Sequence, residues 1–353
     1  MSEPAGLLRK GMQELTFVAP GQVEWREAAA PALQGDGEAL VRPLAVATCD
    51  LDAAIVRGRV PFPGPFPLGH ESVGEVLAIG DRVTAVRPGD RVVVPFQPAC
   101  GTCRFCARGL TANCNQVPRT SMYGIGVVGG SWGGTLADVV RVPFADAMLV
   151  PLPAGVSPAA AASAGDNIAD GWRAVAPQLA AYPGGRVLVL AGGDAASIPL
   201  YATAVALALG AEGVAYHDRD ARRLALAKAL GAAAHVVDAW PERLGSFPIT
   251  VDASQDPDGL ACALRSTEPG GHCTSTSIYF GGPVPVPMLE LYMKGITFTT
   301  GRVHSRTVLP AVLDLIAAGR IDPTRVTTET APWGEAADAL LGYSTKLIVL
   351  RDR

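Results

Sequence analysis

The pattern of apolar and polar residues divides the chain into three regions. The first, residues 1–153, contains short Val-rich runs separated by Gly and Pro, and it has little helical periodicity. Short runs of this kind predict β-strands joined by turns. We therefore expect a β-rich, partly barrel-like domain, with strands at 38–45, 73–79, 91–95 and 137–142.

The second region, residues 154–298, alternates apolar runs with Ala- and Leu-rich helical segments. Buried parallel strands read as short continuous apolar runs, and Gly210 and Gly231 stand where helices would end. Strand–helix alternation predicts a doubly wound parallel sheet. The expected strands are 186–191, 214–217, 235–237 and 249–253, and the expected helices are 198–209 and 221–230.

The last region, residues 299–353, mixes both patterns. Residues 308–318 and 336–341 predict helices, and residues 346–350 predict a closing strand. At roughly 150 residues per domain, a chain of 353 residues suggests two domains.

Composition excludes several classes of protein. Hydrophobic residues make up 49% of the chain and charged residues 18%, which excludes a disordered protein. The net charge of −4, without a basic block, argues against nucleic acid as a partner. Residues 1–10 lack the apolar core of a secretion signal, and Gly, Asp and Pro interrupt the apolar stretch 187–209. We expect a cytoplasmic protein with no membrane partner.

Four of the seven cysteines fall in one short segment, with the spacing Cys100-x2-Cys103-x2-Cys106-x7-Cys114. Four thiolates saturate a tetrahedral zinc ion, so such a site is structural and has no open position for substrate. The alternatives are four unliganded thiols or a zinc ribbon that binds nucleic acid, but the loop offers only Arg104 and Arg108 as phosphate contacts. The odd number of cysteines fits metal binding in a reducing compartment better than a disulfide framework.

A second motif surrounds His70. It reads Gly69-His70-Glu71-x2-Gly74-x5-Gly80-x2-Val83, and Cys49 precedes it in the chain. On these residues and the four-cysteine segment, the chain resembles the zinc-containing medium-chain dehydrogenase/reductase family, alcohol dehydrogenase type. The resemblance covers essentially the whole chain. It implies a GroES-like catalytic domain at 1–153 and 299–353, and a Rossmann dinucleotide-binding domain at 154–298.

The resemblance implies, position by position, a catalytic zinc held by Cys49, His70 and Asp166, with a fourth position for water or a substrate oxygen. The alternative for Asp166 is an ordinary residue at a helix end. Glu71 matches a carboxylate that can approach the metal in relatives, and Asp52 matches one that orients the metal-bound His. Together with the four-cysteine site, this implies two zinc ions per chain.

The chain departs from the family pattern at Leu51. Relatives commonly carry Ser or Thr at this position, and that hydroxyl starts a proton relay. Leucine cannot relay a proton, so proton transfer would use Thr48, Asp50, Glu71 or bound water.

A glycine turn follows the first strand of the second region. Backbone N–H groups at Gly192 and Gly193, followed by a helix N-terminus, suit a pyrophosphate. The turn is not a regular G-x-G-x-x-G, and Pro199 removes one possible N–H donor. Asp218 ends the next strand and suits the adenosine ribose hydroxyls, so NAD is favoured over NADP.

Basic residues near this site could reverse the preference for NAD by binding the 2′-phosphate of NADP. Arg219 is assigned to the cofactor, and together with Arg222 and Arg223 it could compensate for a 2′-phosphate. Lys346 lies at about the position where relatives carry a basic residue facing the cofactor pyrophosphate. The segment Thr300-Gly301-Arg302 is a second possibility for that contact.

These features together predict a zinc-dependent alcohol dehydrogenase. Such an enzyme transfers hydride reversibly between an alcohol or carbonyl substrate and NAD(H), with zinc polarising the substrate oxygen. The altered glycine turn and Leu51 leave two alternatives, namely a member recruited to non-redox, lyase-like chemistry and a non-catalytic zinc protein. The expected partners are a small-molecule substrate and further copies of the chain, because relatives are homodimers or homotetramers.

Overall fold

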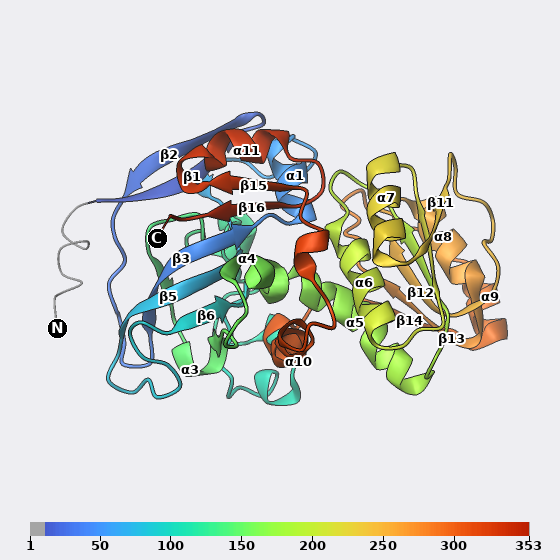
Figure 1. Ribbon diagram of the computed structural model, residues 1–353, viewed down its shortest axis with the longest axis horizontal. Coiled ribbons are helices and arrows are strands. Elements are labelled where there is room, and N and C mark those ends of the chain that lie inside the picture. The colour runs from blue at the N-terminus through green and yellow to red at the C-terminus, as the bar shows by residue number, and fades with distance from the viewer. Residues whose placement is uncertain (1–10, 353) are drawn as a thin grey trace. The chain divides into compact units, whose positions relative to one another are not determined.

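The computed structural model describes residues 11–352. The prediction about a secretion signal concerns residues 1–10, which lie outside this range. The chain forms two compact units, whose elements are labelled in Figure 1. One unit extends to Ala169 and resumes at His304, and the other is Asp170–Val303. The boundaries expected from the sequence, at 153/154 and 298/299, lie earlier. The segment 158–169 belongs to the first unit because it packs against that unit's sheet.

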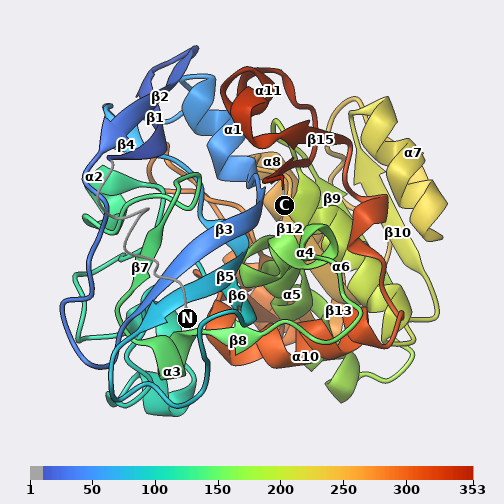
Figure 2. The same cartoon turned by 60° about the vertical axis from the view of Figure 1, so that its left-hand side comes forward.

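Mainly antiparallel sheets build the first unit. The larger sheet runs, in order, through β15 (Glu329–Pro332), β16 (Leu347–Leu350), β3 (Ala39–Ala47), β5 (Glu71–Ile79), β6 (Arg91–Val94) and β8 (Val150–Pro151), with β7 (Val140–Val142) paired to β3. The smaller sheet consists of β2 (Gln22–Ala28), β1 (Met12–Ala19) and β4 (Phe66–Pro67), as Figure 2 shows. Buried valines of β3, β5 and β6 form one core with Tyr123 and Met148. The expected β-rich domain is confirmed.

Short helices and 3₁₀ turns connect these strands. The helices are α1 (Asp50–Val56), α2 (Gly126–Gly129), α3 (Ala145–Met148), α4 (Pro158–Ala161), α10 (Ser305–Ala317) and α11 (Ala336–Gly342), and the 3₁₀ turns are η2 (Cys106–Arg108), η3 (Thr111–Asn113), η4 (Ala162–Gly165), η5 (Pro323–Arg325) and η6 (Trp333–Glu335). Helix α5 (Asn167–Ala181) begins in the first unit and continues into the second. The sequence pattern does not reveal α5, which contains Pro177.

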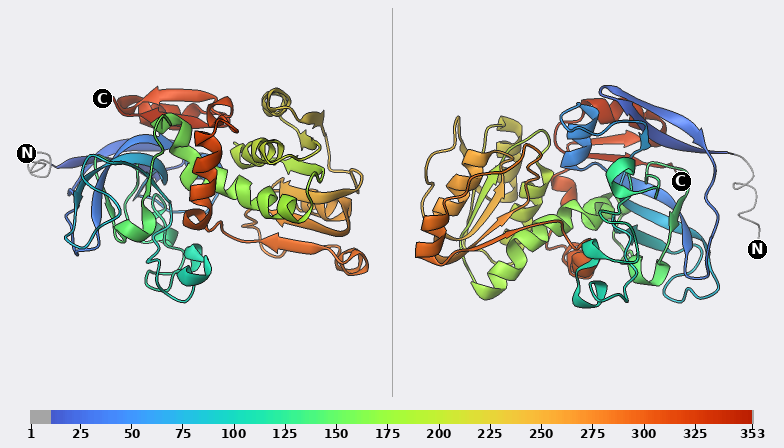
Figure 3. Two further views of the ribbon diagram at one scale, coloured as in Figure 1. Left: turned by 60° about the horizontal axis from the view of Figure 1, so that its bottom comes forward. Right: turned by 180° about the vertical axis from the view of Figure 1, so that it is seen from behind.

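A six-stranded parallel sheet forms the centre of the second unit. Its strand order is β11 (Ala233–Val236), β10 (Val214–Asp218), β9 (Val187–Ala191), β12 (Phe247–Ala253), β13 (Thr267–Ser275) and β14 (Thr297–Thr300). Helices α6 (Ser197–Ala208) and α7 (Ala221–Leu230) cover one face, and α8 (Pro257–Ser266) and α9 (Met288–Lys294) lie on the other (Figure 3). Connections that run in both directions from the centre of the sheet give this arrangement. The expected doubly wound sheet is confirmed.

Local signals explain where the helices of this sheet begin and end. The Asp220 carboxylate accepts hydrogen bonds from two backbone N–H groups in the first turn of α7. Gly231 ends that helix with φ 109°, a left-handed conformation that favours glycine. Helix α8 begins in the same way, with Asp256 as the N-cap and Pro257 in the first turn. No helix in the described part of the chain has the length and apolar character needed to cross a bilayer.

The carboxyl ends of β9, β10 and β12 meet at one edge of the parallel sheet. Strand β9 pairs with both neighbours, and Leu190 lies opposite His217 of β10. The loops that follow these strands therefore bring Gly192, Asp218 and Ser254 to the same edge. Doubly wound sheets bind their ligands at this end of the strands.

Candidate functional site

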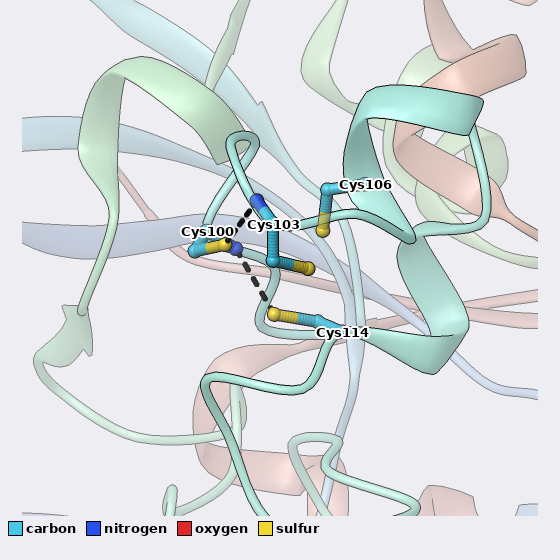
Figure 4. Close-up of side chains that lie close together, drawn as sticks. All are labelled: Cys100, Cys103, Cys106 and Cys114. Atoms are coloured by element: carbon cyan, nitrogen blue, oxygen red, sulfur yellow. Dashed lines mark hydrogen bonds between the residues drawn. The ribbon is translucent and has the colours of Figure 1, made fainter.

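Four cysteines converge in the loop between β6 and β7. Their Sγ atoms lie within 4.8 Å of one another, and Figure 4 shows the side chains turned toward a common centre. The backbone N–H of Cys103 donates to Cys100 Sγ at 3.3 Å, and that of Cys100 donates to Cys114 Sγ at 3.4 Å. Four sulfurs in this arrangement match the donor set of a closed tetrahedral zinc site.

Hydrogen bonds and burial separate the pKa values of these thiols. Backbone N–H groups of Cys106 and Asn115 lower the pKa of Cys103 to about 6. Burial raises the pKa of Cys106 to about 12 and also raises that of Cys114. A bound cation would favour the charged form of all four sulfurs.

A second group of potential ligands lies near the start of α1 and β5. One ligand atom from each of Cys49, His70, Glu71 and Asp166 lies within 4.8 Å of the others, and all four residues are buried. Cys49 is the N-cap of α1, His70 directly precedes β5, and Glu71 begins it. Asp166 joins η4 to α5. The fold therefore brings together all the residues assigned by resemblance to the catalytic zinc.

His70 faces a carboxylate at each ring nitrogen. Its Nε2 lies 3.3 Å from Asp166 Oδ2, and its Nδ1 lies 3.6 Å from Asp52 Oδ1. The other Asp52 oxygen accepts a hydrogen bond from the backbone N–H of Cys49 at 2.8 Å. Asp52 therefore caps α1 and also stands where a carboxylate can orient a metal-bound His.

The electrostatics of this cluster favour a bound cation. Burial and the carboxylate of Asp166 raise the pKa of Cys49 well above its usual range. Burial also raises the pKa of Glu71, and the ammonium group of Lys346 opposes this shift. Burial alone would lower the pKa of His70, but Asp52 and Asp166 raise it to about 9. These shifts reflect a buried excess of negative charge, which a divalent cation would offset. The donors therefore fit zinc.

Lys346 belongs to this cluster. Its side chain is fully buried, and Nζ donates to Thr48 O, to Glu71 Oε1 at 3.0 Å and to Asn167 Oδ1 at 2.7 Å. An ammonium has three protons, and these acceptors use them. The lysine is the buried partner of Glu71, and its assignment to the cofactor pyrophosphate stays a prediction.

Two groups considered as proton carriers are engaged elsewhere. The Thr48 hydroxyl accepts from the backbone N–H of Leu347 at 3.0 Å and donates to its carbonyl at 3.4 Å. Glu71 is paired with Lys346. Leu51 contributes only its backbone N–H, which donates to Cys49 Sγ at 3.5 Å.

Gly192 and Gly193 form the expected turn after β9. The backbone N–H of Gly192 donates to Ala253 O at 3.0 Å, so it is not a donor for a pyrophosphate as the sequence predicted. A Cβ added at Gly192 would lie 2.1 Å from Ser254 O. Gly193 has φ 76°, and an added Cβ would lie 2.5 Å from the Gln255 side chain. Both positions require glycine. The turn leads into α6, whose N-terminus suits a phosphate group.

Asp218 ends β10 as expected, but its carboxylate is fully buried. It accepts from the backbone N–H groups of Arg219 at 2.7 Å and Asp220 at 3.0 Å. It also accepts from Nε and Nη2 of Arg223, each at 2.7 Å, in a bidentate ion pair. These donors occupy the oxygens that the sequence analysis assigned to ribose hydroxyls. We therefore correct that assignment, because Asp218 organises the loop and does not present a free carboxylate.

The neighbouring arginines also have acidic partners. Arg219 lies 3.2 Å from Asp256 and over the ring of Trp240. Arg222 lies 3.3 Å from Asp220. Arg219 thus lies at the edge that the sequence predicted, where it forms a partly exposed ion pair with Asp256.

Two residues of these sites were given no role from the sequence, and a third was given a different one. Asn167 contacts Cys49, Gln255 lies against Gly193, and Arg223 was considered only as a phosphate ligand. The only signal for Asn167 was its place directly after Asp166.

Known proteins share this architecture. The family model of the alcohol dehydrogenase GroES-like domain matches residues 35–154, and that of the zinc-binding dehydrogenase matches residues 197–318. A probable zinc-binding alcohol dehydrogenase of Mycobacterium tuberculosis is 31% identical over 340 residues, which cover 95% of this chain and 85% of that protein. Geraniol dehydrogenase of Castellaniella defragrans is 30% identical over 325 residues, which cover 84% of each protein.

A solved structure extends the likeness to three dimensions. Alcohol dehydrogenase TADH from Thermus sp. ATN1 has a TM-score of 0.84 and 30% identity, covering 96% of this chain and all of that chain. The likeness thus spans both units and the segments that carry the two clusters. The chain belongs to the zinc-binding alcohol dehydrogenases of the medium-chain dehydrogenase/reductase family.

Proposed function

We propose that this protein is a zinc-dependent alcohol dehydrogenase that transfers hydride reversibly between an alcohol or carbonyl compound and NAD(H). The observation that carries the proposal is the convergence of Cys49, His70 and Asp166, buried and within 4.8 Å of one another, in a member of this family. Zinc in this cluster supplies Lewis acidity toward the substrate oxygen, and the nicotinamide supplies the hydride chemistry.

Neighbouring side chains orient the proposed metal ligands and balance the charge around them. Asp52 faces Nδ1 of His70, which leaves Nε2 for the metal beside Asp166 Oδ2. Lys346 neutralises Glu71, so this carboxylate adds no net charge to the site. Among the metal ligands themselves, one thiolate and one carboxylate then balance a dication. A neutral centre polarises a substrate oxygen more strongly than an anionic one would.

The four-cysteine cluster holds the second zinc in this proposal. Zinc and four thiolates together carry a net charge of −2, and the ion has no open position. The role of this site is therefore to stabilise the loop between β6 and β7. All seven cysteines of the chain are free of disulfides. This state fits the reducing conditions of the cytoplasm.

The acidic partners of the arginines favour NAD over NADP. Each of Arg219, Arg222 and Arg223 is already paired with an aspartate at the nucleotide edge. A 2′-phosphate would have to displace one of these aspartates or lie beside it, and like charges in contact are costly. We expect NADH to bind at least about tenfold more tightly than NADPH in fluorescence titrations. Equal affinities would contradict this preference.

An apolar surface on the second unit supports assembly into homodimers or homotetramers. Its exposed large side chains are Ile278, Phe280, Met288, Leu289, Tyr292 and Met293. Strand β14, which follows α9 in the chain, is an uncharged edge strand. An apolar patch beside an uncharged edge suits a symmetric contact with a second copy. In sedimentation experiments, Leu289→Arg should shift the protein toward monomers, whereas Leu341→Arg on the first unit should not; a monomeric wild-type protein would contradict assembly.

Metal counting and cofactor titration test the main proposal. We expect two zinc ions per chain by elemental analysis, and NADH binding by nicotinamide fluorescence. Cys49→Ala should lose one zinc and the alcohol- or aldehyde-dependent turnover while retaining NADH binding. Cys262→Ala is the matched control, because Cys262 is buried outside both clusters, and it should retain both zinc ions.

Two results would overturn the proposal. A zinc content that Cys49→Ala leaves unchanged would remove Cys49 from the ligand set. Two zinc ions in a protein that binds neither NADH nor NADPH would point to non-redox chemistry at the metal.

A further inference from the structure

Asn167, the first residue of α5, links several members of the buried metal cluster. Its side chain is fully buried. Its Oδ1 accepts from Lys346 Nζ at 2.7 Å, and its Nδ2 donates to Cys49 Sγ at 3.4 Å. Its backbone N–H donates to Glu71 Oε2 at 3.4 Å. Asn167 also follows Asp166 directly, so its placement affects three of the four residues of the cluster.

The contact with Lys346 determines which way the Asn167 amide points. An ammonium group has donors only, so the atom that faces it must be the amide oxygen. The amide NH₂ then faces Cys49, where it can only donate. Lys346 is itself held by Glu71 and by Thr48 O. The buried hydrogen-bond network therefore fixes the orientation of the Asn167 amide, so that its N–H points toward the sulfur.

Several N–H groups point at the Cys49 sulfur, among them the backbone N–H of Asp52 in the capping box of α1. Of these donors, the one from Asn167 belongs to a side chain. The backbone N–H of Leu51 donates at 3.5 Å and would be present with almost any residue at that position. The donor from Asn167 exists because the residue is asparagine. Asn167 is therefore the residue whose side chain determines the hydrogen bonding of the Cys49 sulfur.

We propose that Asn167 is a positioning residue that orients the Cys49 thiolate and reduces its electron donation through an N–H···S hydrogen bond. The inference rests on the proposed function, in which Cys49 is a metal ligand. A hydrogen bond to a ligating sulfur withdraws electron density from it, and outer hydrogen bonds of this kind tune metal sites. Weaker donation from sulfur leaves more Lewis acidity for the open position.

Cobalt substitution tests this role without measuring turnover. Thiolate bound to Co²⁺ gives a sulfur-to-metal charge-transfer band whose energy follows the electron density on sulfur. For wild type and for each Asn167 variant, the spectrum of the same protein carrying Cys49→Ala is subtracted. The difference is the part of the band that depends on Cys49. The subtraction removes the contribution of the four-cysteine site.

Two substitutions of Asn167 separate the hydrogen bond from other effects. Asn167→Asp keeps the size and an oxygen for Lys346 but has no N–H for the sulfur. Asn167→Ala removes both contacts without adding a charge. We expect the Cys49-dependent band to move to longer wavelength in both variants. We also expect the Co²⁺ affinity of this site to fall about tenfold in Asn167→Ala. A merely structural role would lower the melting temperature without moving the band.

The outcomes distinguish this inference from the function on which it rests. An unmoved band and an affinity within about twofold of wild type, in a folded variant, would overturn the role of Asn167 while leaving Cys49 as a ligand. If Cys49→Ala leaves the wild-type spectrum unchanged, Cys49 is not a ligand and both proposals fail. If Asn167→Ala does not fold, the band of Asn167→Asp decides.

Discussion

Lys346 Nζ lies 3.0 Å from Glu71 Oε1, and both side chains are completely buried. The two residues are 275 positions apart in the chain. They meet because β16 and β5 flank β3 in the larger sheet of the first unit. The ion pair therefore ties the metal cluster to the core of that sheet.

Removing one partner of this pair should be strongly destabilising. Lys346→Met leaves the Glu71 carboxylate buried without its cation, and we expect the free energy of unfolding to fall by about 3–5 kcal/mol. The double variant Lys346→Met/Glu71→Gln should recover much of that loss, because no buried charge is left unpaired. Urea denaturation measures both. Lys228→Met, at an exposed position of α7, is the control and should change stability by less than about 0.5 kcal/mol. A Lys346→Met protein as stable as this control would disprove the prediction.

The arginines that follow Asp218 should differ sharply in their effect on stability. Arg223 pairs with Asp218 in the protein interior, so Arg223→Met should cost about 3–5 kcal/mol. Arg222 makes its ion pair with Asp220 in solvent, so Arg222→Met should cost at most about 1 kcal/mol. The two substitutions change the same residue type on one helix, which makes each a control for the other. Similar denaturation midpoints for both variants would contradict the buried pair.

The glycine turn should tolerate no side chain at Gly192. An added Cβ would lie 2.1 Å from Ser254 O, so Gly192→Ala must displace the backbone of the turn or of the loop after β12. We expect a loss of about 1–3 kcal/mol in stability and about tenfold weaker NADH binding. Gly213→Ala is the matched control in the same unit, because an added Cβ there meets nothing within 4 Å. Fluorescence titration with NADH would refute the prediction if both variants bound equally.

Acid should destabilise the protein partly through His217. Burial lowers the pKa of His217 to about 4, with a smaller effect from His235, whose ring stacks on it at 4.8 Å. In the unfolded chain its pKa is about 6.5, so between pH 6.5 and 4 only the unfolded state gains the proton. The contribution of His217 is thus complete above pH 6.5 and is lost as the pH falls toward 4, by about 1.4 kcal/mol per pH unit.

Unfolding measured across this pH range isolates the effect. In His217→Asn, the free energy of unfolding should fall less steeply between pH 6.5 and 4 than in wild type. The difference between the two proteins removes the contributions of other titrating groups. Parallel pH profiles would show that His217 does not remain neutral in the folded protein.

Much of the fold could be predicted because its signals are local. Helix α7 has the predicted bounds, since Asp220 caps its start and Gly231 permits the left-handed conformation at its end. The four-cysteine cluster was also evident, because its ligands lie within one short loop. By contrast, Cys49, His70 and Asp166 lie on separate segments, and only the resemblance to a family suggested that they meet.

The sequence by itself determined the strands and helices that carry local signals, such as β9 and α7, and the short motif that gathers four thiols, since these depend on neighbours along the chain. It did not reveal helix α5. Only the tertiary structure decided the partners of the buried charges. Lys346 forms an ion pair with Glu71, and Asp218 forms one with Arg223. From the sequence, both Lys346 and Asp218 were assigned to cofactor binding. The physical reason is that a charge in a low-dielectric interior requires an opposite charge or a hydrogen-bond partner within a few ångströms. Which side chain meets that requirement depends on the packing of strands that are distant in sequence.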